Sequence, residues 1–142
     1  MQEMTVSATV DNIEVVTEFI NAELERLGCG WETVCQIDIA VDELFGNIAR
    51  YAYAAEAGPV TVQIEAVDAP TGVIITFIDR GIAYNPLLAK APDVTLKPGE
   101  RPVGGLGIYM VKKRMDGMEY SREDGCNKLS IRKYFVTAQL QR

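Results

Sequence analysis

The spacing of hydrophobic positions changes several times along this 142-residue chain. Apolar and polar side chains alternate over residues 5–10, as they do in an edge strand. Apolar side chains then recur with helical spacing from Val15 to Leu27, and again over residues 31–54. The first half of the chain is therefore predicted to form a strand followed by two helices.

The second half is dominated by strand-like segments. Residues 60–66 and 73–79 are rich in β-branched side chains and flank a turn at 68–72, which predicts a hairpin. Residues 81–102 contain four prolines and little periodicity, which predicts a long loop. The remaining elements that we expect are a helix over 105–115 and strands near 118–122 and 128–137.

This order of elements favours an α+β fold. We expect a two-layer sandwich, in which a mixed, mostly antiparallel sheet is covered by helices on one face. The length of 142 residues suits one domain over residues 1–142, and the sequence contains no internal repeat or linker.

Composition and charge exclude several functions. The net charge is −6, so direct binding of nucleic acid is not expected. The chain has no histidine, which excludes Ser-His and Cys-His catalysis and disfavours a transition-metal centre. Three cysteines without CxxC spacing indicate reduced thiols. No apolar run is long enough to span a membrane and the N-terminus lacks a secretory pattern, so a cytoplasmic location is expected.

A glycine-rich segment precedes the third predicted helix. Gly104, Gly105 and Gly107, with Leu106 among them, lead into an apolar run. Glycines allow a close approach of the backbone, and a helix start offers unpaired N–H groups that suit phosphate. The alternative is a simple turn before a helix.

A polar pair lies within the second predicted helix. Glu43 and Asn47 are four residues apart, so a helix places both on one face. A carboxylate can accept a proton, and an amide oxygen can bind Mg²⁺. Two solvated helix residues are the alternative. Gly46, which costs roughly 1 kcal/mol relative to alanine in a helix, hints that another group approaches closely.

The third candidate is Asp79, which ends a β-branched strand and is followed by Gly81. An aspartate at the end of a buried strand can accept a hydrogen bond from an amino group such as that of adenine. Alternatively, Asp79 and Gly81 form only a turn.

Together and in this order, the three segments resemble the ATP-binding boxes of the GHKL, or Bergerat-fold, ATPase family. Glu43 and Asn47 resemble its N box, and Asp79-x-Gly81 and the segment 104–107 resemble its two glycine boxes. Ser130 stands where the family often has a Thr or Ser on the adenine side. The resemblance spans the chain from about Thr5 to Phe135.

Within this family, the chain is most similar to the small bacterial anti-sigma-factor serine kinases. The segments 47–53 and 107–120 resemble that branch, as does a short ATP lid at about 82–103. Two residues depart from its pattern: Tyr51 replaces the usual histidine and Asn85 a common aspartate.

The resemblance implies ATP and Mg²⁺ as ligands, with a division of roles among the residues. Asp79 would bind adenine with Gly81 leaving room for the base, Asn47 would ligate Mg²⁺, and residues 104–107 would hold phosphates. Glu43 would orient or deprotonate a substrate serine, and Arg101 in the lid would reach the terminal phosphate.

The resemblance also implies partners. Proteins of this branch bind a sigma factor, phosphorylate a serine of an anti-anti-sigma antagonist, and commonly form homodimers. One alternative is an ATP-binding regulatory module that sequesters a partner without kinase activity. Another, the catalytic domain of a histidine kinase, is disfavoured by the short lid and by the lack of a phosphoacceptor histidine.

Overall fold

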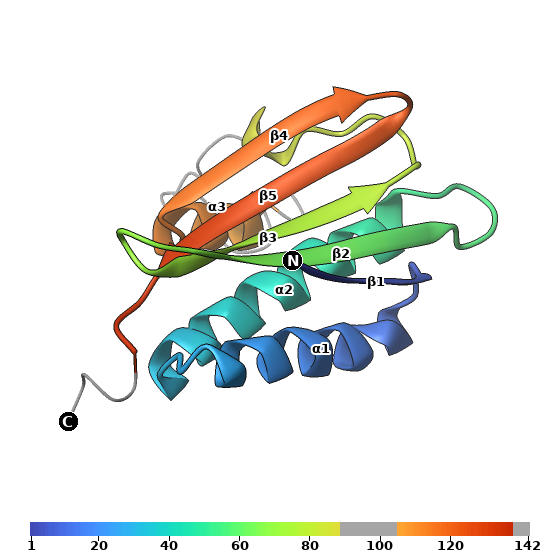
Figure 1. Cartoon of the computed structure of the whole chain (residues 1–142). Coiled ribbons are helices and arrows are strands. Elements are labelled where there is room, and N and C mark those ends of the chain that lie inside the picture. The colour runs from blue at the N-terminus through green and yellow to red at the C-terminus, as the bar shows by residue number, and fades with distance from the viewer. Residues whose placement is uncertain (89–104, 138–142) are drawn as a thin grey trace.

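The structure, a computed structural model, describes residues 1–88 and 105–137. Three helices and five strands form within these residues, close to the predicted positions (Figure 1). In chain order they are β1 (Gln2–Ser7), α1 (Ile13–Arg26), α2 (Trp31–Tyr51), β2 (Pro59–Val67), β3 (Gly72–Asp79), α3 (Gly105–Arg114), β4 (Gly117–Glu123) and β5 (Cys126–Tyr134), with short 3-10 turns η1 (Val10–Asn12) and η2 (Pro86–Leu88).

The five strands form one sheet in the order β1-β2-β3-β5-β4. Each of its four pairings is antiparallel, so the α+β prediction is confirmed and the described strands include no parallel pair. The helix α3 lies between β3 and β4 in sequence, and this connection allows β5 to pair with both β3 and β4. Figure 1 shows α1 and α2 packed along the sheet.

The alternation of side chains gives the sheet a buried face and an open face. Val73, Ile75 and Phe77 of β3 are at most 1% exposed and join one core cluster with residues of all three helices. The side chains between them, such as Thr76, are only partly buried. A residue's place in this alternation therefore decides whether it faces the helices.

The described helices include none that is both long and apolar enough to cross a membrane.

Candidate nucleotide-binding site

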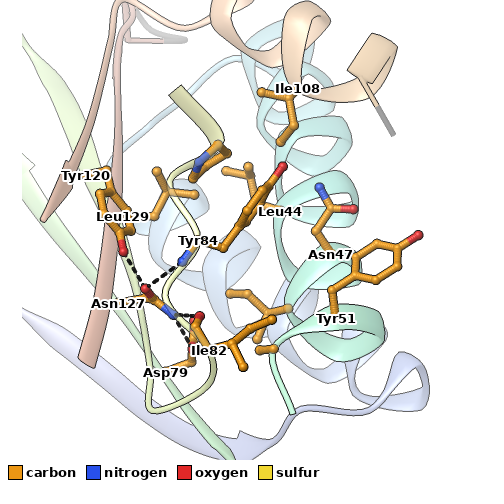
Figure 2. Close-up of a pocket in the computed structure, with 13 residues that line it drawn as sticks. Leu44, Asn47, Tyr51, Asp79, Ile82, Tyr84, Ile108, Tyr120, Asn127 and Leu129 are labelled. Carbon is orange, nitrogen blue, oxygen red and sulfur yellow. Dashed lines mark hydrogen bonds between the residues drawn. The ribbon is translucent and has the colours of Figure 1, made fainter. Parts of the chain in front are cut away.

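A cavity of about 270 Å³ lies on the buried face of the sheet, near the lower end of the range of roughly 300 Å³ and above that is typical of ligand pockets. It opens between the C-terminal half of α2, the first turns of α3 and the ends of β3 and β5 (Figure 2). Its walls are mostly apolar, with a few polar groups. The lining residues are Leu44, Asn47, Ile48, Tyr51, Ala52, Asp79, Ile82, Tyr84, Pro86, Ile108, Tyr120, Asn127 and Leu129.

Asp79 lies at one end of the cavity and is only 4% exposed. Its Oδ1 atom accepts hydrogen bonds from the Gly81 backbone N–H at 2.8 Å and from Asn127 Nδ2 at 2.9 Å. Within the described part of the chain, no hydrogen bond reaches its Oδ2 atom. Asp79 therefore has one oxygen held by the protein and one available to a ligand.

Asn127 is the centre of this end of the cavity (Figure 2). It is 6% exposed, and its Nδ2 also donates to the Ile82 carbonyl at 2.8 Å. Its Oδ1 accepts from the Tyr84 backbone N–H at 3.3 Å and from the Tyr120 hydroxyl. Because the oxygen is occupied by two donors, the amide group is held with its NH₂ toward Asp79.

The sequence analysis did not identify Asn127, and the structure does not bring the predicted residue Ser130 into the lining of the cavity. In the sheet, Asp79 pairs with Asn127, whereas Ser130 pairs with Thr76. Ser130 lies on the open face, where its hydroxyl is 2.8 Å from that of Thr76. Asn127 and Ser130 are three positions apart on β5 and therefore lie on opposite faces, so only Asn127 shares the buried face with Asp79. That alternation was visible in the sequence, since Leu129 and Ile131 are the apolar positions of β5.

Residues 81–88 are fastened to the wall of the cavity. The Gly81 carbonyl accepts from Arg122 Nη1 at 2.8 Å, and the Leu87 carbonyl accepts from Lys112 Nζ at 2.8 Å. Asn85, one of the two departures from the family pattern, forms a turn in which its Oδ1 accepts from the Leu87 N–H at 2.9 Å.

Gly81 is required by a close contact of its own. A Cβ atom at this position would lie 2.2 Å from the carbonyl oxygen of Ala52, at the end of α2. The same carbonyl accepts a hydrogen bond from the Ile82 N–H at 2.9 Å. The glycine thus lets the strand end of β3 meet the helix end of α2.

Tyr53 fixes the same junction. Its hydroxyl donates to the Pro59 carbonyl at 2.6 Å and accepts from the Arg80 backbone N–H at 2.8 Å. Burial raises the pKa of Tyr53, so its hydroxyl remains a donor over the ordinary pH range. Tyr53 therefore links the backbone next to Asp79 to the start of β2.

The other end of the cavity lies where α2 meets α3. The Glu43 carboxylate packs so closely against Gly107 that a Cβ there would lie 2.1 Å from Glu43 Oε1. Asn47 donates from Nδ2 to that oxygen at 3.3 Å. Glu43, Asn47 and the first turn of α3 therefore meet at this end of the cavity, and their binding of one common ligand stays a prediction.

Some of the remaining residues singled out in the sequence lie within the described part of the chain, and others lie outside it. Gly105 and Leu106 begin α3, and Leu106 is 48% exposed. Tyr51, the second departure, lines the cavity and is 53% exposed. Gly46 is approached most closely by the Arg50 guanidinium of its own helix, at 2.9 Å from a Cβ. Arg101, Gly104 and most of the predicted lid lie outside the described residues.

Comparison with known proteins shows similar chains of nearly the same length. The serine-protein kinase RsbW of Bacillus mycoides (strain KBAB4) is 24% identical over 143 residues, which cover 98% of this chain and 88% of that protein. RsbW of Bacillus cereus (strain B4264) is 25% identical with the same coverage. These similarities confirm the predicted resemblance to GHKL proteins of the RsbW type.

Solved structures share the fold. The RsbU and RsbW domains of Rv1364c from Mycobacterium tuberculosis superpose with a TM-score of 0.62 at 14% identity, over 95% of this chain and 33% of that one. The profile of the histidine kinase-like ATPase domain matches residues 6–133, which include α2, β3, α3 and every described residue of the cavity. The chain belongs to the histidine kinase-like ATPase domain family.

Proposed function

We propose that this protein is an ATP-dependent serine protein kinase that also acts as an anti-sigma factor. One observation carries the proposal: the Glu43 carboxylate and the Asn47 amide meet the start of α3 beside the cavity, which Asn47 lines at this end and Asp79 lines at the other. A base-binding carboxylate, a helix N-terminus and a proton acceptor are thus arranged around one cavity.

The Asp79 end suits adenine. Asp79 Oδ2 accepts a hydrogen bond from the exocyclic amino group of the base, while Oδ1 stays bonded to Gly81 and Asn127. Guanine presents a carbonyl oxygen at the corresponding position, which a carboxylate repels. The rings of Tyr51 and Tyr84, each about half exposed, border the cavity and offer aromatic surface to the base.

The α3 end suits phosphate and a cation. The backbone N–H groups at residues 105–107 begin α3 and so have no partner within that helix, and they bind phosphate oxygens. Asn47 donates from Nδ2 to Glu43, so its Oδ1 is available to a hard cation. No cluster of three or more acidic, Cys or His side chains that could hold a metal occurs among residues 1–88 and 105–137. The arrangement therefore fits a Mg²⁺ ion that arrives with the phosphates and neutralises their charge.

Glu43 is the proton acceptor in this proposal. The Oγ atom of a substrate serine attacks the γ-phosphorus, the bond to the β-phosphate bridging oxygen breaks, and ADP leaves with that electron pair. The serine proton passes to the Glu43 carboxylate. Packing of Glu43 against Gly107 fixes the acceptor at the point where the helix N–H groups hold the phosphates.

The protein partners follow from the relatives. Serine-protein kinases RsbW match 98% of this chain, and their resemblance supports a serine of an anti-anti-sigma antagonist as substrate and a sigma factor as bound partner. We also propose that Arg101 and Gly104 complete the phosphate end, and that the protein acts in the cytoplasm as a homodimer.

Phosphotransfer from labelled ATP tests the proposal. The protein is incubated with Mg²⁺, γ-labelled ATP and each anti-anti-sigma protein encoded in the same genome, and label on serine is measured. We expect transfer to one antagonist, and a fall of about 100-fold or more in Glu43→Gln with ATP affinity preserved. Asp79→Asn should instead lose ATP affinity.

Two outcomes contradict the proposal in different ways. Transfer by Glu43→Gln at the wild-type rate would exclude Glu43 as the proton acceptor. ATP binding without transfer to any antagonist would instead identify a regulatory module in which the nucleotide only controls partner binding.

A further inference from the structure

Three apolar side chains form an exposed row on α2, away from the cavity. Trp31 is 77% exposed, Ile39 is 60% exposed, and Cys35 between them is also exposed. They are spaced four residues apart, so they follow one side of the helix over about 12 Å. Such a row requires an explanation, because α2 already buries another set of apolar residues, among them Ile37, Val41 and Leu44.

An acidic row runs along α1. Glu14, Glu18 and Glu25 are exposed, and at about 100° per residue they fall within roughly 40° of one another around the helix. Glu32 and Asp42 add two exposed carboxylates beside the apolar row of α2. The only exposed basic residues of the two helices are Arg26, which is paired with Glu23, and Arg50 near the end of α2.

The contact between the helices places these rows next to each other. Asn21 of α1 interacts with Asp38 of α2, and a short turn at residues 27–30 makes the helices antiparallel (Figure 1). Around α1 the acidic row begins about 20° from Asn21, and around α2 the apolar row begins about 20° from Asp38. Both rows therefore lie along the outer side of the contact between α1 and α2.

We propose that this α1/α2 surface is a docking site for a basic amphipathic helix of a partner protein. The apolar side of that helix covers Trp31, Cys35 and Ile39, and its Lys or Arg side chains face the carboxylates of α1. A tryptophan in an apolar strip with charges at the rim is the arrangement of an interface hot spot. The inference involves neither the cavity nor a nucleotide, so it does not depend on the proposed phosphotransfer.

Charge selects this occupant over two others. A second copy of the chain would bring its own acidic row against the first, and like charges oppose that contact. An anionic membrane surface is repelled in the same way. A cationic amphipathic helix is the occupant whose binding is favoured both by the apolar row and by the acidic residues beside it.

Trp31 is the only tryptophan of the chain, so its fluorescence reports on this surface alone. The full-length protein is titrated with an 18-residue peptide designed as a helix, with leucines on one side and lysines elsewhere, and with a second peptide in which glutamates replace the lysines. We expect the lysine peptide to shift Trp31 emission to shorter wavelength with saturation, and the glutamate peptide to cause no shift.

Two variants and a matched control separate this surface from general charge attraction. Glu18→Lys with Glu25→Lys should weaken the lysine peptide about tenfold, and Ile39→Glu should weaken it by more than tenfold. Glu65→Lys with Glu119→Lys makes the same charge change on the exposed sheet strands and should leave affinity within twofold. Circular dichroism and ATP affinity confirm that each variant keeps its fold.

Three results would overturn the inference. They are an unchanged Trp31 spectrum with the lysine peptide, equal binding of the glutamate peptide, and equal weakening by the control pair. If sedimentation shows that Ile39→Glu converts a dimer to a monomer, the surface is instead an interface between copies of this chain.

Discussion

The two ends of the cavity are built in different ways. At the Asp79 end, five hydrogen bonds join Asn127 and Asp79 to each other and to Gly81, Ile82, Tyr84 and Tyr120. At the Glu43 end, one hydrogen bond of 3.3 Å between Asn47 and Glu43 is accompanied by the packing of Glu43 on Gly107. Hydrogen bonds among buried polar groups fix the Asp79 end, whereas close packing of Glu43 on Gly107 fixes the Glu43 end.

This difference corresponds to two tasks. Recognition of a neutral base needs donors and acceptors that are in place before the base arrives. Hydrogen bonds among buried polar groups hold those donors and acceptors in position. Phosphates and a cation bring strong charges of their own, so the groups that meet them must keep free lone pairs and N–H groups. We therefore expect mutations at the Asp79 end to affect folding and binding together, and mutations at the Glu43 end to separate the two.

The largest effect is expected for Asn127→Asp. This change replaces the NH₂ donor beside Asp79 with a second buried carboxylate, and above neutral pH the folded protein should lose about 3 kcal/mol of stability and about 100-fold in ATP affinity. The shared site raises one carboxyl pKa above its unfolded value. Stability and affinity should therefore recover as the pH falls through that raised pKa, because the protonated group donates again.

Chemical denaturation and ATP titration at pH 8 and pH 5.5 check this result, with wild type measured at both values. If the deficit of Asn127→Asp is the same at both pH values, Asn127 does not act as a donor to Asp79. An Asn127→Leu variant, which cannot titrate, should show no recovery and controls for general damage to the cavity.

Replacing one glycine with alanine at each end of the cavity tests this contrast between the two ends. Gly81→Ala places a methyl group against the Ala52 backbone carbonyl and should cost about 2–3 kcal/mol of stability. Gly107→Ala meets only the flexible end of Glu43, and alanine is the better helix former by about 1 kcal/mol, so the fold should be unharmed. Displacement of Glu43 should nevertheless reduce phosphotransfer about 100-fold.

Thermal unfolding measures the first quantity and label transfer the second. If Gly107→Ala destabilises the protein as much as Gly81→Ala does, the Glu43 end is as rigid as the Asp79 end and the contrast fails. Gly46→Ala, which meets only the Arg50 side chain, is the matched helix-glycine control and should preserve both stability and transfer.

The fold was largely predictable because each element carries its own local signal. Alternation in β2 and β3, helical spacing in α1 and α2, and the glycines before α3 all depend on neighbours in sequence. The strand order was not predictable, since pairing of β5 with β3 joins residues 48 to 62 positions apart. The sheet was accordingly expected to be mixed and mostly antiparallel, and the described pairings are all antiparallel.

In the candidate site too, contacts set by spacing along the sequence were predicted, and contacts set by strand pairing were not. Glu43 and Asn47 are close because they are one helical turn apart, and their spacing alone indicates this. Asn127 reaches Asp79 only through the register between β3 and β5, so a family position three residues away was selected in its place. Tyr84 and Tyr120 were missed for the same reason, since each enters the network through Asn127.

A smaller effect is expected for Tyr120→Phe. The hydroxyl that this change removes is one of two donors to Asn127 Oδ1, and the Tyr84 N–H remains as the other. We expect a loss of about 1 kcal/mol in stability and a loss of about fivefold in ATP affinity. The measurement is a double-mutant cycle with Asn127→Leu, in which the effect of Tyr120→Phe should vanish. Full additivity would show that Tyr120 acts on the cavity without Asn127.

The smallest effect is expected for Ser130→Ala, and it distinguishes the two faces of the sheet. The hydroxyl of Ser130 meets Thr76 on the open face, so its loss should cost at most about 1 kcal/mol of stability and leave ATP affinity unchanged within error. Thr76→Val, which removes the other hydroxyl of the pair, should have the same result. A fall in ATP affinity of more than threefold in Ser130→Ala alone would place Ser130 in contact with the base. The register of β5 against β3, on which the assignment of Asn127 to the Asp79 end depends, would then have to shift.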